Sequence, residues 1–78
     1  MALKVGSRLM FSTRTSTVWV RVSGLNDTRV DVTLEDNRQR RGEMIVHRPG
    51  LKLRNFAERL ALIDVCREFV EKGGLSNE

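Results

Sequence analysis

The segments Thr17-Val18-Trp19-Val20-Arg21-Val22-Ser23 and Arg29-Val30-Asp31-Val32-Thr33-Leu34-Glu35 decide the fold of this chain. In each segment, β-branched or leucine residues alternate with mostly polar ones. A period of two places alternate side chains on opposite faces of a strand, so the pattern predicts two half-buried antiparallel strands. The link from Gly24 to Thr28 contains turn-forming residues, which predicts that the strands form a hairpin.

Two weaker segments extend this hairpin into a three- to four-stranded antiparallel sheet. Ser7 to Thr13 has Leu9 and Phe11 on one side. Glu43 to Arg48 is a fourth strand that ends at Pro49-Gly50, because proline cannot donate to a strand ladder. The alternative is a strongly bent sheet that closes into a small five-stranded barrel of the SH3 or Sm type.

The pattern after Gly50 changes to that of one C-terminal helix, from about Phe56 to Lys72. Asn55 and Glu58 have the spacing of an N-cap with a glutamate that reaches back to it. Gly73-Gly74 is a typical C-terminal stop. The expected fold class is therefore α+β, with a frayed tail over residues 75–78. The apolar side of the helix holds Leu62, Ile63, Val65, Cys66, Phe69 and Val70, with Phe56 and Leu60 at its margin.

A chain of 78 residues is long enough for one domain, residues 1–78, with a small core. Its single cysteine cannot form an internal disulfide, which favours a reducing compartment. We recognise no signal peptide and no apolar stretch of the length a membrane span needs, so we expect a cytoplasmic protein with no membrane contact. Small domains without disulfides or metals are often stabilised by dimerisation.

Arginine dominates the charge of the chain. Eleven of the 14 basic residues are arginine, and the formal net charge is +4. Arg38, Arg40 and Arg41 lie together in the predicted turn from Asp36 to Gly42. Guanidinium groups bind phosphate or carboxylate through two hydrogen bonds, so the turn is a candidate site for nucleic-acid phosphate. The alternative is a solvated loop whose charge keeps the protein soluble.

The outward face of the predicted hairpin is a second candidate site. Trp19 and Arg21 are neighbours on this face, and Arg29 lies across from them if the hairpin register is tight. An exposed aromatic ring beside arginines can stack on a base. The acids on the same face, Asp31, Glu35 and Glu43, would repel phosphate. The alternative is a tryptophan that packs under a loop or against a neighbouring subunit.

The apolar side of the predicted helix is wider than the stripe of about 100° that one sheet face requires. Arg59 lies in the middle of this side, where it must reach solvent or find a carboxylate. We therefore expect the helix also to contact a partner, most simply in a homodimer. The candidate interface residues are Arg59, Ile63, Cys66 and Val70.

Catalytic and metal-binding chemistry find little support in the sequence. His47 is the only histidine, and Cys66 faces the apolar side of the helix with no histidine placed to activate it. One cysteine and one histidine cannot build a zinc site, and no glycine-rich phosphate loop is present. We expect no enzyme activity, no cofactor and no metal.

Residues 17–72, read as three strands followed by a helix, are similar in element order to the integrase amino-terminal and plant ethylene-responsive DNA-binding domains. That resemblance implies a sheet in the major groove of duplex DNA. The residues in contact with phosphate or guanine would then be Arg21, Arg29, Arg38, Arg40 and Arg41.

Two functions from different classes follow. The first is a nucleic-acid-binding accessory or regulatory protein that grips the backbone of duplex DNA or RNA with its arginine-rich turn. The alternative is a protein-interaction module, such as an adaptor, an inhibitor or an antitoxin-like regulator. It would bind an acidic protein through the helix face or a sheet edge.

Overall fold

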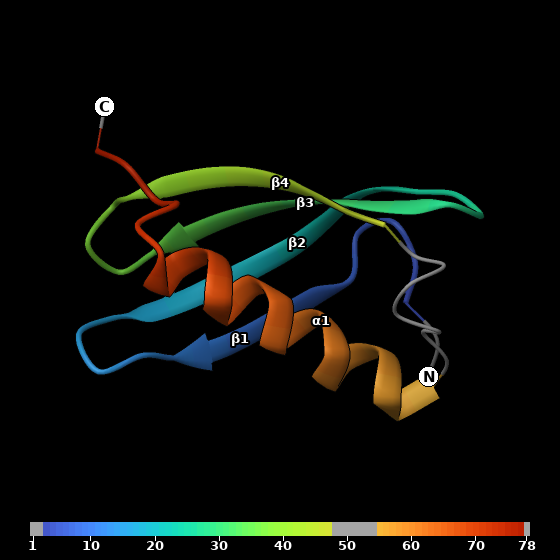
Figure 1. The fold of residues 1–78 in the computed structure, drawn as a ribbon, viewed down its shortest axis with the longest axis horizontal. Coiled ribbons are helices and arrows are strands. Elements are labelled where there is room, and N and C mark those ends of the chain that lie inside the picture. Colours follow the sequence, from blue (N-terminus) through green and yellow to red (C-terminus); the bar gives the residue numbers. More distant parts are fainter. Residues whose placement is uncertain (1–2, 48–54, 78) are drawn as a thin grey trace.

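The computed structural model describes residues 3–47 and 55–77. It contains a four-stranded antiparallel sheet followed by one C-terminal helix, which confirms the α+β class (Figure 1). The sheet order is β1-β2-β3-β4, and β1 and β4 do not pair, so the sheet is not closed into a barrel. The elements are β1 (Arg8–Ser12), β2 (Thr17–Leu25), β3 (Arg29–Asp36), β4 (Arg41–His47) and α1 (Asn55–Glu71).

The expected strand end at Arg48-Pro49-Gly50 lies outside the described residues. The same holds for the side chains of Asn55 and Phe56, which were expected to cap the helix and to border its apolar side.

The inner face of the sheet follows the alternation in the sequence. Val18, Val20 and Val22 on β2 are buried, and so are Val30, Val32 and Leu34 on β3. The register sets Val20 opposite Leu34 and Val22 opposite Val32, so the two inward rows meet as cross-strand pairs. These branched side chains are the centre of the core because both strands direct one complete face inward.

A β-bulge interrupts the β2–β3 pairing between Val22 and Gly24. Closer to the other end of the hairpin, Trp19 pairs with Glu35 and Arg21 pairs with Thr33. The expectation that Arg29 lies across from Trp19 and Arg21 is therefore wrong. Arg29 directly follows the β2–β3 turn, so it begins β3 at the turn end of the hairpin, away from Trp19 and Arg21. It pairs with His47 of β4.

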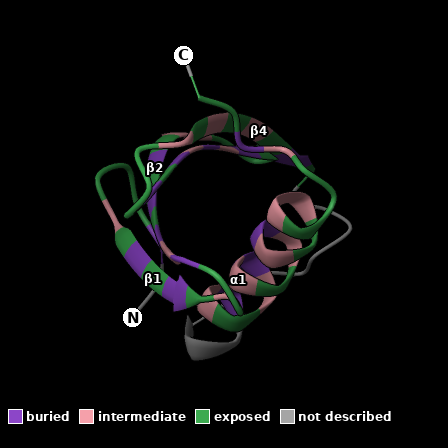
Figure 2. Ribbon diagram, turned by 90° about the vertical axis from the view of Figure 1, so that its left-hand side faces the viewer, coloured by how far each residue is buried: buried purple, intermediate pink, exposed green. Residues whose placement is uncertain are grey.

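Helix α1 covers the inner face of the sheet, which curves around it (Figure 2). Leu62 and Cys66, one turn apart, have no exposed surface and complete the core. Glu58, one turn before Leu62, is also buried, and its Oε2 accepts a hydrogen bond of 2.8 Å from the backbone N–H of Leu3. Within the described residues, no helix has the length and apolar character that a membrane crossing requires.

The end of α1 has the glycine stop that the sequence predicts. Gly73 N–H donates to the carbonyl of Val70, and Gly74 N–H donates to that of Phe69, which is the pattern of a Schellman motif. Gly73 has a φ of 83°, in the left-handed region that glycine adopts without strain.

The expectation of a frayed tail over residues 75–78 is wrong for the part that the structure describes. Leu75 is buried at 7% exposure. Ser76 pairs with Arg41 through two backbone hydrogen bonds of 3.0 and 2.9 Å, so the tail adds one bridge to the edge of β4. A Cβ on Gly42 would lie 2.9 Å from the carbonyl oxygen of Gly74, so glycine at this position leaves room for the tail.

Candidate functional site

The arginine-rich turn between β3 and β4 is organised by a buried carboxylate. Asp36 Oδ1 accepts hydrogen bonds from the backbone N–H groups of Arg38 (3.0 Å) and Arg40 (2.8 Å). Asp36 Oδ2 accepts a hydrogen bond of 2.8 Å from Nε of Arg40 and lies 2.7 Å from its Nη2. Burial raises the pKa of the Asp36 carboxyl, but the hydrogen bonds from Arg40 and Arg38 outweigh it, and the net pKa is lowered.

Arg40 and Asn37 join the turn to the neighbouring β1–β2 loop. Nη2 of Arg40 lies 3.4 Å from Oγ of Ser16, which is buried in that loop. Asn37 and Thr17 exchange two further hydrogen bonds of 3.0 Å, from Asn37 N–H to the Thr17 carbonyl and from Thr17 N–H to Asn37 Oδ1. The two loops therefore form one rigid end of the sheet.

The three turn arginines consequently differ from one another. Arg40 is engaged with Asp36, and its side chain is only 26% exposed. Arg41 makes an ion pair of 3.1 Å with Glu35, in which both side chains are well exposed. Among the described residues, Arg38 has no ion-pair partner, and it is exposed. The turn thus offers Arg38 freely and Arg41 through a weak surface pair, while Arg40 holds the turn together.

The outer face of β1 and β2 carries the second group of candidate residues. Arg8 pairs with Arg21, and Met10 pairs with Trp19. These are non-hydrogen-bonded pairs, because the ladder bond from Val22 N–H to the carbonyl of Ser7 sets the alternation. Side chains in such pairs are about 5 Å apart at Cβ, so two arginines stand side by side next to an exposed ring. We call Arg8, Met10, Trp19 and Arg21 the β1–β2 patch.

Two like charges directly opposite each other on a sheet are unfavourable. Among the described residues, neither Arg8 nor Arg21 has a carboxylate partner. Trp19 is 47% exposed and Met10 60% exposed, so neither is packed under a loop of its own chain. The patch therefore combines two unneutralised guanidinium groups with an open aromatic surface.

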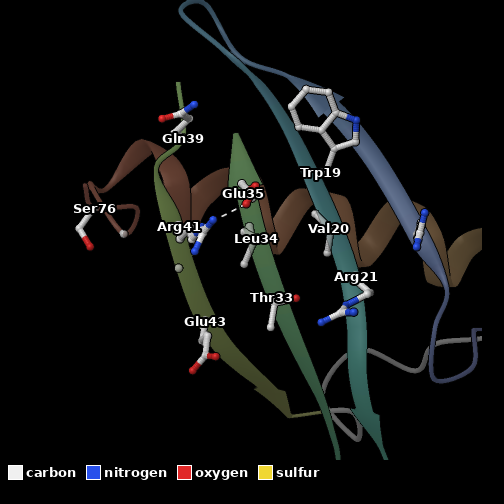
Figure 3. Close-up of a pocket in the computed structure, with 13 residues that line it drawn as sticks. Trp19, Val20, Arg21, Thr33, Leu34, Glu35, Gln39, Arg41, Glu43 and Ser76 are labelled. Atoms are coloured by element: carbon white, nitrogen blue, oxygen red, sulfur yellow. Dashed lines mark hydrogen bonds and ion pairs between the residues drawn. The ribbon is translucent and has the colours of Figure 1, made fainter. Parts of the chain in front are cut away.

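The acids of the outer face lie on β3 and β4, where Glu35 is the cross-strand neighbour of Trp19. Glu35 is paired with Arg41, and Asp31 is paired with Arg29 at 3.2 Å. Figure 3 shows Trp19 and Arg21 on β2 and the Glu35–Arg41 pair across β3 and β4. These side chains line a broad hollow of about 1270 Å³ that also includes Arg8, Gln39 and Ser76. The acids Asp31 and Glu35 thus meet arginines of their own chain, whereas Glu43, which also lines the hollow, has no ion-pair partner among the described residues. The β1–β2 patch itself carries only cationic charge.

The candidate interface residues on α1 face mostly toward their own chain. Cys66 is fully buried in the core, so it has no surface with which to meet a partner. Ile63 and Val70 are partly buried and pack against the core, and Arg59 is half-buried. The largest exposed apolar side chain of the helix among the described residues is Leu60, at the margin of the expected face.

The residues considered for catalysis are separated in the structure. His47 is exposed at the end of β4, whereas Cys66 lies in the core, where burial raises the pKa of its thiol to about 12. In the part of the chain that the structure describes, no three histidine, cysteine or acidic side chains are grouped as metal ligands would be.

The sequence reasoning missed Arg8. The signal was present, because Leu9 and Phe11 face inward and the same alternation turns Arg8 and Met10 outward. Its importance depends on the register, which sets Arg8 opposite Arg21 and could not be read from so weak a strand. Arg14 in the β1–β2 loop was also missed. It is exposed in the loop that is hydrogen-bonded to the β3–β4 turn, which carries Arg38.

Comparisons of the chain with protein-family models, with curated proteins and with solved structures found no match. The similarity in element order to three-stranded DNA-binding domains is therefore not supported by a family match. The fourth strand and the tail bridge at Ser76 also depart from that pattern.

Proposed function

We propose that the protein is a nucleic-acid-binding accessory or regulatory protein that holds the phosphate backbone on the outer face of its sheet. The observation that carries this proposal is the cross-strand pair Arg8–Arg21 beside the exposed ring of Trp19. An anion between the two guanidinium groups would remove their repulsion and give each a charge-assisted hydrogen bond. A nucleic acid offers such anions at regular spacing.

The dimensions of the surface fit several nucleotides. Four residues separate Arg21 from Thr17, which corresponds to about 13 Å along a strand. The Thr17–Asn37 hydrogen bonds lead from this point to the loops that carry Arg14 and Arg38. Since successive nucleotides of one strand rise about 3.4 Å along a duplex axis, a backbone along this path would meet cations at both of its ends. Trp19 lies between them, where it can contact a sugar or stack on a base.

We therefore assign the binding residues differently from the expectation based on the sequence. Arg38 remains a candidate phosphate ligand, and Arg41 can contribute if its exposed pair with Glu35 opens. Arg40 acts indirectly, by holding the turn through Asp36. The proposed phosphate binding depends mainly on Arg21, with Trp19 beside it. Arg29 lies at the turn end of the hairpin and is paired with Asp31.

Tryptophan fluorescence provides the test, because Trp19 is the only tryptophan in the chain. We expect single-stranded or duplex oligonucleotides to change the Trp19 emission, with an affinity that falls as salt rises. Arg8→Ala and Arg21→Ala should each weaken binding similarly across sequences and reduce the salt slope by about 1. The control is Lys72→Ala, which removes the same charge from the end of α1, where Lys72 pairs with Glu68. Equal affinities of the arginine variants and the control would refute the assignment.

A module that binds an acidic protein is the second candidate, and the exposure of Met10 beside Trp19 favours it. Flexible apolar side chains next to aromatic rings and arginines are common in protein interfaces. Parallel pull-downs from untreated and from nuclease-treated lysate separate the two candidates. A stoichiometric protein partner that survives nuclease treatment and is lost with Met10→Ser supports the interaction module, whereas nucleic acid recovered from the untreated lysate, with no protein partner from the treated one, supports the first proposal.

A further inference from the structure

The edge of β4 that faces away from β3 has backbone hydrogen bonds at its Arg41 end. Arg41 exchanges two hydrogen bonds with Ser76 on the side away from β3. Because the direction of backbone groups alternates along a strand, the N–H and C=O groups of Glu43, Ile45 and His47 point to the same side. Among the described residues, only the tail at Ser76 pairs with this edge. Within residues 3–47 and 55–77, the edge is thus paired at Arg41 and has no partner strand from Glu43 to His47.

Of the three residues along the open part, only Glu43 carries the kind of charge that protects an edge. Edge strands usually avoid self-association through charged residues, proline or a covering element. Here the middle residue, Ile45, is 55% exposed on the outer face. Glu43 has no ion-pair partner among the described residues, and its neighbour on β3 is Thr33. His47 lies beside Arg29 at the other end.

We propose that the protein forms a homodimer in which two copies of β4 pair antiparallel through this edge, with Ile45 on the two-fold axis. In this register Ile45 faces Ile45 of the second copy, and Glu43 faces the His47–Arg29 end of the second copy. All three edge residues then exchange backbone hydrogen bonds. The apolar side chains meet each other, and the Glu43 carboxylate meets His47, which lies beside the Arg29–Asp31 ion pair, so the edge is complementary to itself.

Neighbouring registers are less favourable. A shift that pairs Glu43 with Ile45 would bring His47 opposite Arg41, whose backbone is already bonded to Ser76. The opposite shift, which pairs Ile45 with His47, pairs only these two of the three described edge residues with each other. The tail therefore acts as a stop that selects one register of the pair.

This inference does not depend on nucleic-acid binding. The two-fold axis would be perpendicular to the joined sheet, so both β1–β2 patches would lie on the same side of an eight-stranded sheet. A pairing of one short edge is small compared with standard interfaces, and we expect a dimer that dissociates on dilution.

Sedimentation velocity over a concentration series gives the first test. The wild-type chain should change from the mass of a monomer to that of a dimer as concentration rises. Ile45→Pro should remain monomeric with an unchanged circular dichroism spectrum, because the lost N–H points away from β3 and an edge position tolerates proline. A wild-type chain that stays monomeric up to millimolar concentration would overturn the proposal, as would a folded Ile45→Pro variant that still dimerises.

Cross-linking tests the register and does not depend on the proline variant. In a hydrogen-bonded antiparallel pair the Cα atoms are about 5.5 Å apart, which is within the range for a disulfide. Ile45→Cys should therefore form a disulfide-linked dimer under mild oxidation. Glu43→Cys is the matched control, because its two copies would be about four residues, or roughly 13 Å, out of register. The native thiol of Cys66 is buried and does not compete. Cross-linking of Glu43→Cys in preference to Ile45→Cys would refute this register.

Discussion

Replacement of Asp36 by alanine should destabilise the protein far more than any exposed acid does. The substitution removes the acceptor for two backbone N–H groups and for the Arg40 guanidinium, at distances of 2.8 to 3.0 Å. Hydrogen bonds to charged groups contribute about 1.5–3 kcal/mol each, but they are not additive, and Arg40 can partly reach solvent. We expect a loss of about 3 kcal/mol in the free energy of unfolding, near the lower end for a broken buried ion pair. For a domain of this size, that corresponds to a fall in Tm of roughly 12–24 °C.

Thermal and urea unfolding followed by circular dichroism measure this loss. The matched control is Glu35→Gln, which removes the neighbouring carboxylate from an exposed ion pair and should change stability by less than about 0.5 kcal/mol. If Asp36→Ala and Glu35→Gln unfold at the same temperature, the Asp36–Arg40 pair does not hold the turn. Arg40 would then be available to a ligand after all.

The same carboxylate gives a pH dependence of known sign. The hydrogen bonds from Arg40 and Arg38 lower the pKa of Asp36 in the folded protein below its ordinary value of 3.8, despite its burial. The folded state therefore binds this proton less readily than the unfolded state does. The stabilisation is fully present above the ordinary value and is lost as pH falls through the lowered pKa. The difference in stability between wild type and Asp36→Asn should thus stay constant near neutral pH and shrink in acid.

Three further predictions concern other parts of the molecule. Arg8→Thr should raise the free energy of unfolding by a few tenths of a kcal/mol, because it removes the repulsion with Arg21. The same variant should bind nucleic acid more weakly. A loss of stability would contradict the proposed repulsion. Leu75→Ala should lower stability by about 2 kcal/mol in urea unfolding, since Leu75 is buried beside Phe69 and Gly42; an unchanged midpoint would mean that the tail does not pack. Cys66 should react with a thiol reagent only at the rate of unfolding, because burial raises its pKa to about 12 and leaves no access; rapid labelling of the native protein would refute this.

The alternation of valines predicts the fold well because period-two patterning depends only on which face of each strand is buried. The helix, its glycine stop and the four strands follow from the same kind of local signal. The sequence reasoning failed where the outcome depends on pairing across the chain. The bulge near Ser23 and the short turn fix the position of Arg29 relative to β2. No local sequence pattern specifies the bulge or the length of the turn.

The candidate site was harder to predict than the fold, since three clustered arginines look alike in a sequence. Their different roles depend on which carboxylate each one meets. Asp36 belongs to the inward-facing row of β3 and is therefore buried, so it binds Arg40 tightly, whereas Glu35 belongs to the outward row and holds Arg41 only at the surface. The importance of Arg8 likewise appears only once the β1–β2 register is known.

The most direct test of the proposed function is the affinity of the double variant Arg8→Ala/Arg21→Ala for a labelled oligonucleotide, measured at several salt concentrations. The control is Arg59→Ala/Lys72→Ala, which removes the same charge from α1. We predict that the first variant loses most of its affinity and about 2 units of salt slope, while the control binds like wild type. Equal binding by both variants would contradict the central claim that the β1–β2 patch holds phosphate.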